Sequence, residues 1–379
     1  MIKKLKVFVG VSGGVDSSVA LALLQKATPN NFSKLFGRPT PEGFRGYDVT
    51  GVFLKVWNPE WLPCNWKEER RSAMRVCATL GVPFLTFDFG KEYKKEVVDY
   101  MIREYGEGRV PNPDVFCNKY VKFGVFLDKA LDMGVDFIAT GHYAICQRVP
   151  LTYELRESAD KNKDQSYFLY TLSQEQLKHT LFPVGHLTKP EVRKLAKRFG
   201  LPTAEKKDSQ GLCFIGKVDM KDFLAHYIDI KKGNVLNTKG EVIGSHDGAM
   251  FYTIGQRHGF IIIEKTSTDP RFFVVSKNLE KNTITVMDKK SHKDLLYSTK
   301  AVILRDLFFI SGVEPKLPLK TSVRIRYRQE KQNCTLEKKA NDYQIIFDEL
   351  QSGVSIGQSA VLYDGEVCLG GGIIEKVVQ

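Results

Sequence analysis

The sequence has no long apolar run, no closely spaced cysteine pair and no internal repeat. No stretch approaches the roughly 18 apolar residues that a membrane-spanning helix requires, so we expect no membrane partner. Residues 1–10 are basic and then apolar, and we interpret them as a strand rather than a cleavable signal; the protein is therefore predicted to be cytoplasmic. The seven cysteines are odd in number and include no Cys-x-x-Cys pair, which argues against a disulfide framework and against a structural zinc site.

What the chain has instead is length and positive charge. Its 379 residues predict two or three domains, and a hydrophobic content of 42% is typical of a soluble globular protein. Lys and Arg number 56 against 44 Asp and Glu, which gives a formal net charge of +12. A surplus of this size favours a polyanionic partner, nucleic acid before a membrane.

The first part of the chain alternates between short apolar strands and helices. Strands are expected at 5–11, 48–56, 84–88 and 135–140, with helices at 17–26, 68–80, 91–105 and 119–133. This alternation predicts an α/β fold with a parallel sheet and helices on both faces. Ligands of such sheets bind beyond the carboxyl ends of the strands, and all four predicted strand ends carry distinctive loops.

The rest of the chain changes from helical to β-rich. Residues 165–200 are predicted to be helical, with Thr188 and Glu191 as a capping box, and a further helix is predicted at 218–227. Beyond about residue 233, alternating segments between turns predict strands, among them 271–275, 283–287, 322–329 and 343–347. We therefore expect an α/β domain at 1–216, a small β-rich domain at 217–295 and a C-terminal β-barrel at 296–379.

The stretch Ser12-Gly-Gly-Val-Asp-Ser-Ser18 lies between the first predicted strand and the first predicted helix. Two glycines let the backbone approach an anion closely, and the helix N-terminus, capped by Asp16 or Ser17, adds free N–H groups and the positive end of its dipole. An ordinary strand-to-helix turn is the alternative. Because no Gly-Lys-Ser/Thr follows, the loop is not a Walker A motif. It resembles the PP-loop of ATP pyrophosphatases, enzymes that adenylate an oxygen of their substrate and release pyrophosphate.

Further motifs narrow this resemblance, and two of them place a cysteine, Cys117 or Cys213, in a predicted polar loop. They are Asn112-Pro-Asp-Val-Phe-Cys-Asn-Lys119, Gly141-His-Tyr-Ala144, Lys163-Asp-Gln-Ser166, Asp208-Ser-Gln-Gly-Leu-Cys-Phe-Ile-Gly216, Gly255-Gln-Arg257, Arg326-Tyr-Arg-Gln329 and Ile356-Gly-Gln-Ser359. Together with the PP-loop they resemble the tRNA-specific 2-thiouridylase family through essentially the whole chain. The resemblance implies a PP-loop (adenine nucleotide alpha hydrolase-like) domain before the two β-rich domains. It also implies that sulfur replaces O2 of the wobble uridine (U34) of tRNA, with ATP and a persulfide as reactants.

The resemblance assigns the sulfur chemistry to two cysteines. Cys213 carries the persulfide, Cys117 is the second thiol that attacks it, and Asp114 lies beside the target base as an acid or base. Thiols suit this chemistry because they ionise more readily than hydroxyls. The persulfide would come from a cysteine desulfurase or a sulfur-relay protein. The alternative is an iron–sulfur cluster held by Asp114, Cys117 and Cys213, with one iron open to hydrosulfide. Inert thiols are expected at Cys64, Cys77, Cys146, Cys334 and Cys368.

The resemblance also implies contacts with ATP and with tRNA. ATP is expected at Gly10, Val11, Ser12, Gly13, Gly14, Val15, Asp16, Ser17, Leu54 and Gly141. Contacts with tRNA are expected at Asn112, Pro113, Asp114, His142, Lys163, Asp164, Gln165, Arg326, Tyr327 and Gln358. Asp16 is expected to hold Mg²⁺, to cap the helix, or both, and a core histidine is the alternative for His142. Residues 28–46 form a loop longer than is usual in the family, which closes over ATP, touches tRNA or is simply solvated.

The strand predicted at 322–329 places Arg324, Arg326 and Arg328 on one face, where a phosphate backbone would neutralise them. A solvated basic strand is the alternative. Two other functions are alternatives: a ligase similar to argininosuccinate or GMP synthases that acts on a small metabolite, and a catalytically inactive tRNA-binding module. The two loop cysteines and the net charge of +12 count against the first, and the intact PP-loop with both cysteines counts against the second.

Overall fold

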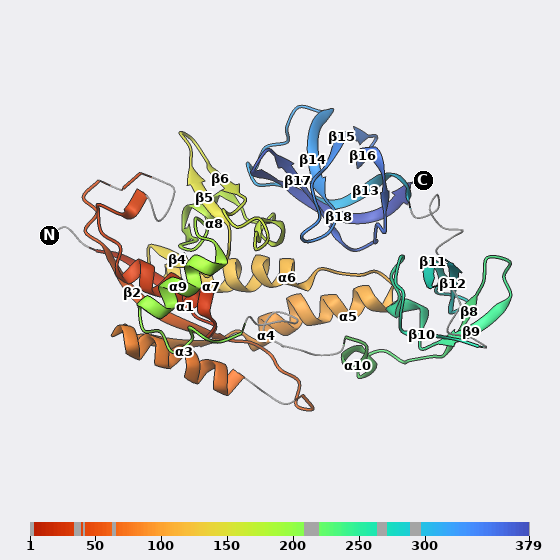
Figure 1. The fold of residues 1–379 in the computed structure, drawn as a ribbon. Helices are drawn as coiled ribbons and strands as arrows, with labels where there is room; N and C mark the ends of the chain where they lie inside the picture. Colours follow the sequence, from red (N-terminus) through yellow and green to blue (C-terminus); the bar gives the residue numbers. More distant parts are fainter. Residues whose placement is uncertain are drawn as a thin grey trace.

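The structure is a computed structural model that describes residues 4–33, 39–40, 42–62, 66–207, 220–263, 271–288 and 297–378. It has an N-terminal α/β domain, a small β domain at the opposite end, and a β-barrel (Figure 1). A helical arm, residues 90–132, runs from the α/β domain toward the small middle domain, and the barrel lies above it in this view (Figure 1). The predicted order of an α/β domain, a β-rich domain and a barrel is confirmed.

The N-terminal domain is built on a five-stranded parallel sheet with the order β3-β2-β1-β4-β7. Its strands are β1 (Leu5–Gly10), β2 (Tyr47–Lys55), β3 (Phe84–Asp88), β4 (Phe137–Ala139) and β7 (Thr180–Leu181). The four predicted strands are confirmed, within a few residues at their ends. The fifth, β7, was missed because two residues are too few to show a period, and the stretch around it was predicted to be helical.

Helices cover both faces of this sheet, as predicted. Val7 and Val9 of β1 pack with α1 (Val15–Gln25), α3 (Trp66–Leu80) and α9 (Lys189–Arg198). Phe8 points to the other face and packs against the arm, because successive strand residues alternate between faces. The predicted capping box begins α9, where the Thr188 N–H donates to the Glu191 carboxylate at 2.8 Å.

The arm consists of two helical stretches joined by a short connection. The first is α4 (Gly90–Tyr93), the π-helical η1 (Lys94–Val98) and α5 (Asp99–Gly106); the second is α6 (Pro113–Phe116), the π-helical η2 (Cys117–Val125) and α7 (Phe126–Asp132). The helix predicted at 119–133 therefore begins six residues earlier, with Pro113 in its first turn, where the missing N–H costs nothing. Cys117 lies on this helix and not in a polar loop, which corrects the sequence prediction. No helix within the described ranges is long and apolar enough to cross a bilayer.

The middle domain is a five-stranded sheet with the order β10-β9-β8-β12-β11. Its elements are α10 (Met220–Ala225), β8 (Gly233–Leu236), β9 (Val242–His246), η4 (Ala249–Phe251), β10 (Phe260–Ile262), β11 (Phe272–Asn278) and β12 (Thr283–Asp288). The strands predicted at 271–275 and 283–287 are confirmed. Val235, Val274 and Ile284 form part of a small core of its own.

The C-terminal part is a closed barrel in which β13 pairs with both β16 and β18. Its strands are β13 (Tyr297–Phe309), β14 (Leu319–Arg324), β15 (Gln332–Lys339), β16 (Asp342–Ser352), β17 (Ser359–Asp364) and β18 (Val367–Val378). The segment between β4 and α9 also contains β5 (Ile145–Arg148), β6 (Tyr153–Arg156), η3 (Ser166–Phe168) and α8 (Gln174–Lys178). The hairpin β5–β6 pairs with β18, so part of the first proposed domain extends the barrel sheet. The boundaries 1–216, 217–295 and 296–379 stay a prediction.

The three arginines predicted to share one strand face do not do so. Strand β14 ends at Arg324, and Arg328 has a positive φ of 64° in the turn that follows. The Arg324 side chain is 11% exposed and pairs with Glu157 at 2.7 Å and with Asp164 at 2.9 Å, both in the N-terminal domain. Arg326 is exposed and donates to the Gly353 carbonyl. The alternation failed because Arg324 serves the interface between the barrel and the α/β domain, not the surface.

This interface leads to a prediction about stability. Replacing Arg324 by Met should lower the free energy of unfolding by about 3–5 kcal/mol, because the Glu157 and Asp164 side chains, 3% and 1% exposed, would lose the guanidinium between them. Arg326→Met is the matched control, since an exposed substitution two residues away should change stability by less than about 0.5 kcal/mol. Urea unfolding followed by circular dichroism measures both, and equal shifts for the two variants would show that the buried pair contributes nothing special.

Candidate functional site

The loop between β1 and α1 is held in one shape by its own serines. The Ser12 N–H donates to Ser17 Oγ at 3.2 Å, and the hydroxyls of Ser17 and Ser18 donate to the Gly14 carbonyl at 3.2 and 2.7 Å. Gly13 has a φ of +74°, and a Cβ there would lie 2.6 Å from the Glu69 carbonyl oxygen. Only glycine therefore fits at this position. The result is a glycine-rich turn that opens onto a helix N-terminus, the arrangement that binds phosphates elsewhere.

Two lysines that the sequence analysis did not single out lie at this loop. Lys206 donates to the Gly13 carbonyl at 3.0 Å, and the Ser72 hydroxyl donates to the same oxygen at 3.2 Å. Lys189 binds both carboxylate oxygens of Asp16, at 2.7 and 2.9 Å. The Lys206 ammonium adds positive charge beside the helix N-terminus, which favours an anionic ligand, whereas Asp16 balances the charge of Lys189.

Asp16 does not cap α1, although the sequence predicted Asp16 or Ser17 as the cap. Gly14 is the N-cap, and Asp16 lies in the first turn. Its carboxylate accepts from the Tyr143 hydroxyl at 2.8 Å as well as from Lys189. Asp16 thus anchors the residues that follow β4 to the start of α1.

Gly141 and Leu54, both predicted to approach the nucleotide, have different surroundings. A Cβ on Gly141 would lie 2.5 Å from the Ser17 nitrogen, so the loop after β4 packs directly against the start of α1. The structure therefore brings Gly141 together with the PP-loop. Leu54 is near the carboxyl end of β2 and is 5% exposed in the core between the sheet and the arm.

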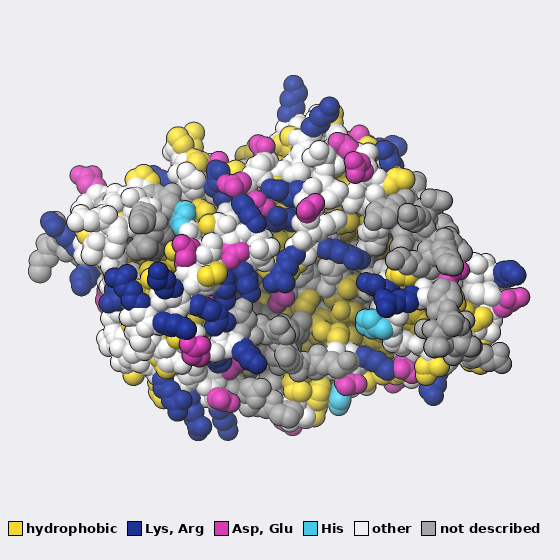
Figure 2. Space-filling view, viewed as in Figure 1, with side chains coloured by type: hydrophobic (Ala, Val, Ile, Leu, Met, Phe, Trp, Pro, Cys, Tyr) yellow, Lys and Arg dark blue, Asp and Glu magenta, His cyan; other side chains and the backbone are white. Residues whose placement is uncertain are grey.

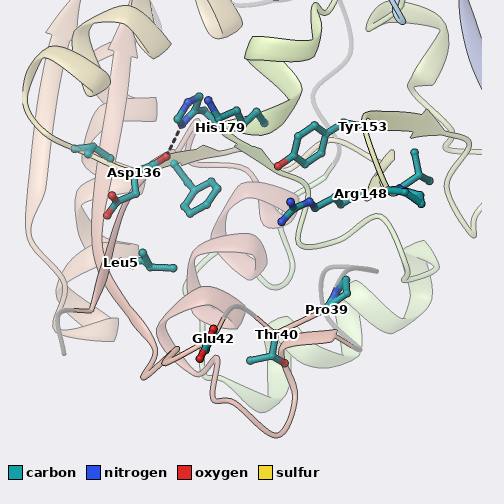
Figure 3. A pocket seen from close by; sticks show the side chains of 13 residues that line it. Leu5, Pro39, Thr40, Glu42, Asp136, Arg148, Tyr153 and His179 are labelled. Atoms are coloured by element: carbon teal, nitrogen blue, oxygen red, sulfur yellow. Dashed lines mark hydrogen bonds between the residues drawn. The ribbon is translucent and has the colours of Figure 1, made fainter.

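Two cavities of about 820 Å³ lie at opposite edges of the parallel sheet. One is lined by Lys55, Trp57 and Asp88 at the carboxyl ends of β2 and β3, the edge where ligands of such sheets bind. The other is lined by Leu5, Asp136 and His179 at the amino ends of β1, β4 and β7, where His179 Nδ1 bonds the Asp136 carbonyl at 2.9 Å (Figure 3). The second cavity lies at the amino ends of the strands, which is not where ligands of a PP-loop bind. Thr40 and Glu42 of the long 28–46 loop line this cavity (Figure 3).

The residues predicted to carry the sulfur chemistry lie at the start of the second arm helix. Asp114 and Cys117 are three positions apart on one helix face. Cys117 is fully buried, with Val115 and Val121 in the same core cluster. Cys213, together with the whole 208–216 motif, lies outside the described residues.

Several predicted tRNA contacts from distant parts of the chain meet beside this helix. The Asn112 side chain lies close to the Tyr167 hydroxyl, and the Gln358 amide donates to the Val110 and Pro111 carbonyls at 2.8 and 3.2 Å. The Tyr327 ring lies 4.4 Å from the Phe168 ring, centroid to centroid. Asn112, Tyr327 and Gln358 are therefore brought together with the start of the helix that carries Cys117.

Two predicted tRNA contacts are buried among protein groups. His142 is 9% exposed, and its Nδ1 bonds the Thr140 hydroxyl at 2.7 Å. Burial and the Lys122 ammonium hold the pKa of His142 well below its usual value, so the ring is neutral. Asp164 is 3% exposed, and its carboxylate accepts from Ser166 as well as from Arg324. This burial favours the core alternative for His142 and gives Asp164 a structural part.

The 163–166 motif links the PP-loop to the barrel. Gln165 Oε1 accepts from the Tyr143 N–H at 2.9 Å, and Tyr143 in turn reaches Asp16. One residue earlier, Asp164 meets Arg324 of the barrel. Lys163 precedes both and is partly exposed.

Lys and Arg side chains gather over the α/β domain and along the barrel side of a hollow above the arm (Figure 2). Hydrophobic side chains are exposed on the floor of that hollow (Figure 2). No group of three or more His, Cys, Asp or Glu side chains is placed to hold a metal ion in the described ranges, which do not include Cys213.

Sequence reasoning missed four residues of this site: Tyr143, Lys189, Lys206 and Asn118. Tyr143 stands in a quoted motif right after a strand end, so its position was a usable signal. Lys189 and Lys206 are ordinary lysines in a basic chain, and no local pattern distinguishes them. Asn118, next to Cys117, donates to the Phe168 carbonyl at 3.0 Å, while its own Oδ1 accepts no hydrogen bond within the described part of the chain.

Comparison with known proteins agrees with this arrangement of domains. Three family models match: the tRNA methyl transferase HUP domain over residues 43–217, the tRNA methyl transferase PRC-barrel domain over 221–288, and the Aminomethyltransferase beta-barrel domain over 299–374. The tRNA-specific 2-thiouridylase MnmA of Pseudomonas paraeruginosa is 43% identical over 374 residues, which cover 98% of this chain and 94% of that protein. The protein of the same name from Stutzerimonas stutzeri is 43% identical over 377 residues, 99% of this chain and 95% of that one.

Among solved structures, U34-tRNA thiolase NcsA from Methanococcus maripaludis matches with 17% identity and a TM-score of 0.34, over 59% of this chain and 65% of that one. A likeness that low supports no inference about function. The full-length relatives do, since their identity extends over all three domains. The chain belongs to the tRNA-specific 2-thiouridylase family.

Proposed function

We propose that this protein is a tRNA-uridine 2-sulfurtransferase that converts the wobble uridine of tRNA to 2-thiouridine with consumption of ATP. Uridine O2 is a poor leaving group, so the reaction first transfers AMP to O2 and releases pyrophosphate. Sulfur then attacks C2, and AMP departs. The observation that carries the proposal is the intact PP-loop with its two lysines, in a chain 43% identical to named 2-thiouridylases over 98% of its length.

The PP-loop is proposed to hold the phosphates of ATP. The N–H groups at the start of α1 and the ammonium groups of Lys189 and Lys206 suit a polyphosphate, and the cavity at the carboxyl ends of β2 and β3 suits the rest of the nucleotide. Asp16 does not fit a direct Mg²⁺ ligand, because its carboxylate is paired with Lys189. Any Mg²⁺ would therefore be held by the phosphates of ATP.

Cys213 and Cys117 are proposed to deliver the sulfur. A cysteine desulfurase or a sulfur-relay protein would supply the persulfide on Cys213. The Cys117 thiolate attacks Sγ of Cys213, hydrosulfide leaves to attack C2 of the adenylated base, and a Cys117–Cys213 disulfide remains for a thiol reductant. Cys117 is 0% exposed, so bulk solvent does not reach its thiol. The iron–sulfur cluster on Asp114, Cys117 and Cys213 remains the alternative.

The wobble base is proposed to enter beside Asn112, Pro113 and Asp114. A base that reacts at C2 must leave the anticodon stack, and enzymes that do this receive it in a pocket. Asn112, Tyr327 and Gln358 supply amide and aromatic groups next to the Asp114 helix, and such groups suit base edges and stacking. The net charge of +12 suits the tRNA backbone.

The cysteine assignment predicts different defects for two variants. Cys213→Ser should abolish thiolation, with near-normal binding of ATP and tRNA, because the acceptor of the persulfide is gone. Cys117→Ser should be equally inactive but should still accept labelled persulfide sulfur on Cys213. Mass analysis of tRNA and of the protein measures both. Equal loss of labelling in the two variants, or a visible absorption band after anaerobic reconstitution, would favour the cluster instead.

The PP-loop assignment predicts loss of tRNA-dependent pyrophosphate release. Asp16→Ala and Ser12→Ala should each slow it by roughly 100-fold, the effect of misplacing reacting groups, because Asp16 anchors Tyr143 and Lys189 and Ser12 bonds Ser17 within the loop. Lys206→Met should act similarly, and Lys207→Met is its matched control, because the neighbouring lysine is exposed and has no contact with the loop in the described structure. Release of ADP and phosphate in place of AMP and pyrophosphate would overturn the assignment.

Arg326 is exposed and remains proposed as a tRNA contact. Arg326→Ala should weaken tRNA affinity and lower the slope of log K against log salt by about one, since one phosphate contact is lost. Lys316→Ala, an exposed change elsewhere on the barrel, is the control, and ATP affinity should not change in either variant. An unchanged slope for Arg326→Ala would remove this part of the barrel from the tRNA surface.

A further inference from the structure

The connection between the two arm helices touches all three parts of the molecule. It consists of residues 107–112, and we call it the junction. From the middle domain, Lys277 donates to the Gly108 carbonyl at 2.6 Å and to the Tyr252 carbonyl at 2.9 Å. Gly108 has a φ of +70°, and a Cβ there would overlap the Leu279 side chain. The middle domain therefore lies directly against the junction backbone.

The barrel holds the other half of the junction. The Val110 N–H donates to the Ile356 carbonyl at 2.9 Å, and Gln358 donates to the Val110 and Pro111 carbonyls. A Cβ on Gly357 would lie 2.9 Å from the Val110 nitrogen. Backbone this close on both sides leaves no room for the junction to shift while the barrel stays in place.

A buried carboxylate, that of Glu104, joins the arm to the junction and to the barrel. Glu104 of α5 is 1% exposed and receives Arg109 of the junction in a bidentate pair at 2.6 and 2.8 Å. Arg305 of the barrel donates to the same carboxylate at 2.6 Å. Burial by itself would raise the pKa of Glu104, but the two guanidiniums hold it below the usual value, so Glu104 is charged. A charge buried between two arginines is costly to separate from either.

We propose that the junction positions the Asn112–Cys117 helix start, so that the placement of the middle domain and the barrel determines where the reacting residues lie. Asn112 is the last junction residue and the N-cap of α6, so the backbone held by these contacts leads directly into the helix that carries Asp114 and Cys117. Glu104 and Lys277 are positioning residues in this arrangement, since neither belongs to the helix that carries the reacting groups. For its catalytic consequence the inference rests on the proposed function.

Lys277 provides the sharper test, because its two acceptors are backbone oxygens on different sides of the contact. Lys277→Met should remove both hydrogen bonds, Lys277→Arg should restore most of the effect, and Lys281→Met is the exposed control a few residues away. Hydrogen–deuterium exchange of residues 108–117 should speed up at least 10-fold in Lys277→Met and stay unchanged in Lys281→Met. Glu104→Gln, which keeps the size and loses the charge, should give the same faster exchange.

The catalytic readout separates positioning from loss of fold. Lys277→Met should lower the single-turnover rate of thiolation by about 10- to 100-fold, the range that misplaced reacting groups produce, while KM for ATP and persulfide labelling of Cys213 stay unchanged. Equal rates and equal exchange in Lys277→Met and Lys281→Met would overturn the proposal, as would equal losses in both. A wild-type protein that forms no 2-thiouridine would refute the proposed function, while the exchange result would still decide whether the junction positions the helix.

Discussion

The arrangement of this molecule depends on the guanidinium of Arg324, which pairs with two buried carboxylates. It joins Glu157 and Asp164 of the α/β domain to the end of β14, and Lys331 adds a second cation to Glu157 at 3.1 Å. Ion pairs at this depth are stable only when every charge has a partner, so barrel and α/β domain adopt one relative position. That position lets Tyr327 reach Phe168 and lets Gln358 reach the junction. The grouping of residues beside Cys117 is thus a consequence of contacts some distance from it.

Much of the α/β domain could be predicted from the sequence because its signals are local. A short apolar strand, two glycines and a helix pattern specify the PP-loop, and the alternation of strands and helices specifies the parallel sheet. Gly141 was found for the same reason, since loops after adjacent parallel strands meet at one edge. These arguments need only neighbours in the chain and the rule for parallel strands.

The errors share a cause, which is that partners distant in the chain override local patterns. The alternating arginines after residue 322 suggested one exposed face, but acidic groups more than 150 residues away bind Arg324 and the strand ends there. The prolines before Cys117 suggested a loop, yet Pro113 begins a helix because it occupies the first turn. Lys189 and Lys206 are far from the PP-loop in the sequence, and only the folded chain brings them to it. The part of the site that includes Cys213 lies outside the described residues and stays a matter of prediction.

The hairpin β5–β6 has a consequence for how such a protein can be divided or recombined. It belongs to the α/β domain by sequence but extends the sheet of the closed barrel, where Leu155 and Arg156 pair with β18. Cutting the chain between the two domains would leave one edge of β6 and the start of β18 without these partners, and open edges associate with other chains. An exchange of barrels between relatives would have to carry residues 145–156 along with the barrel, although 140 residues (157–296) separate the two in the sequence. The unit that could be transferred intact is therefore not a contiguous segment of the chain.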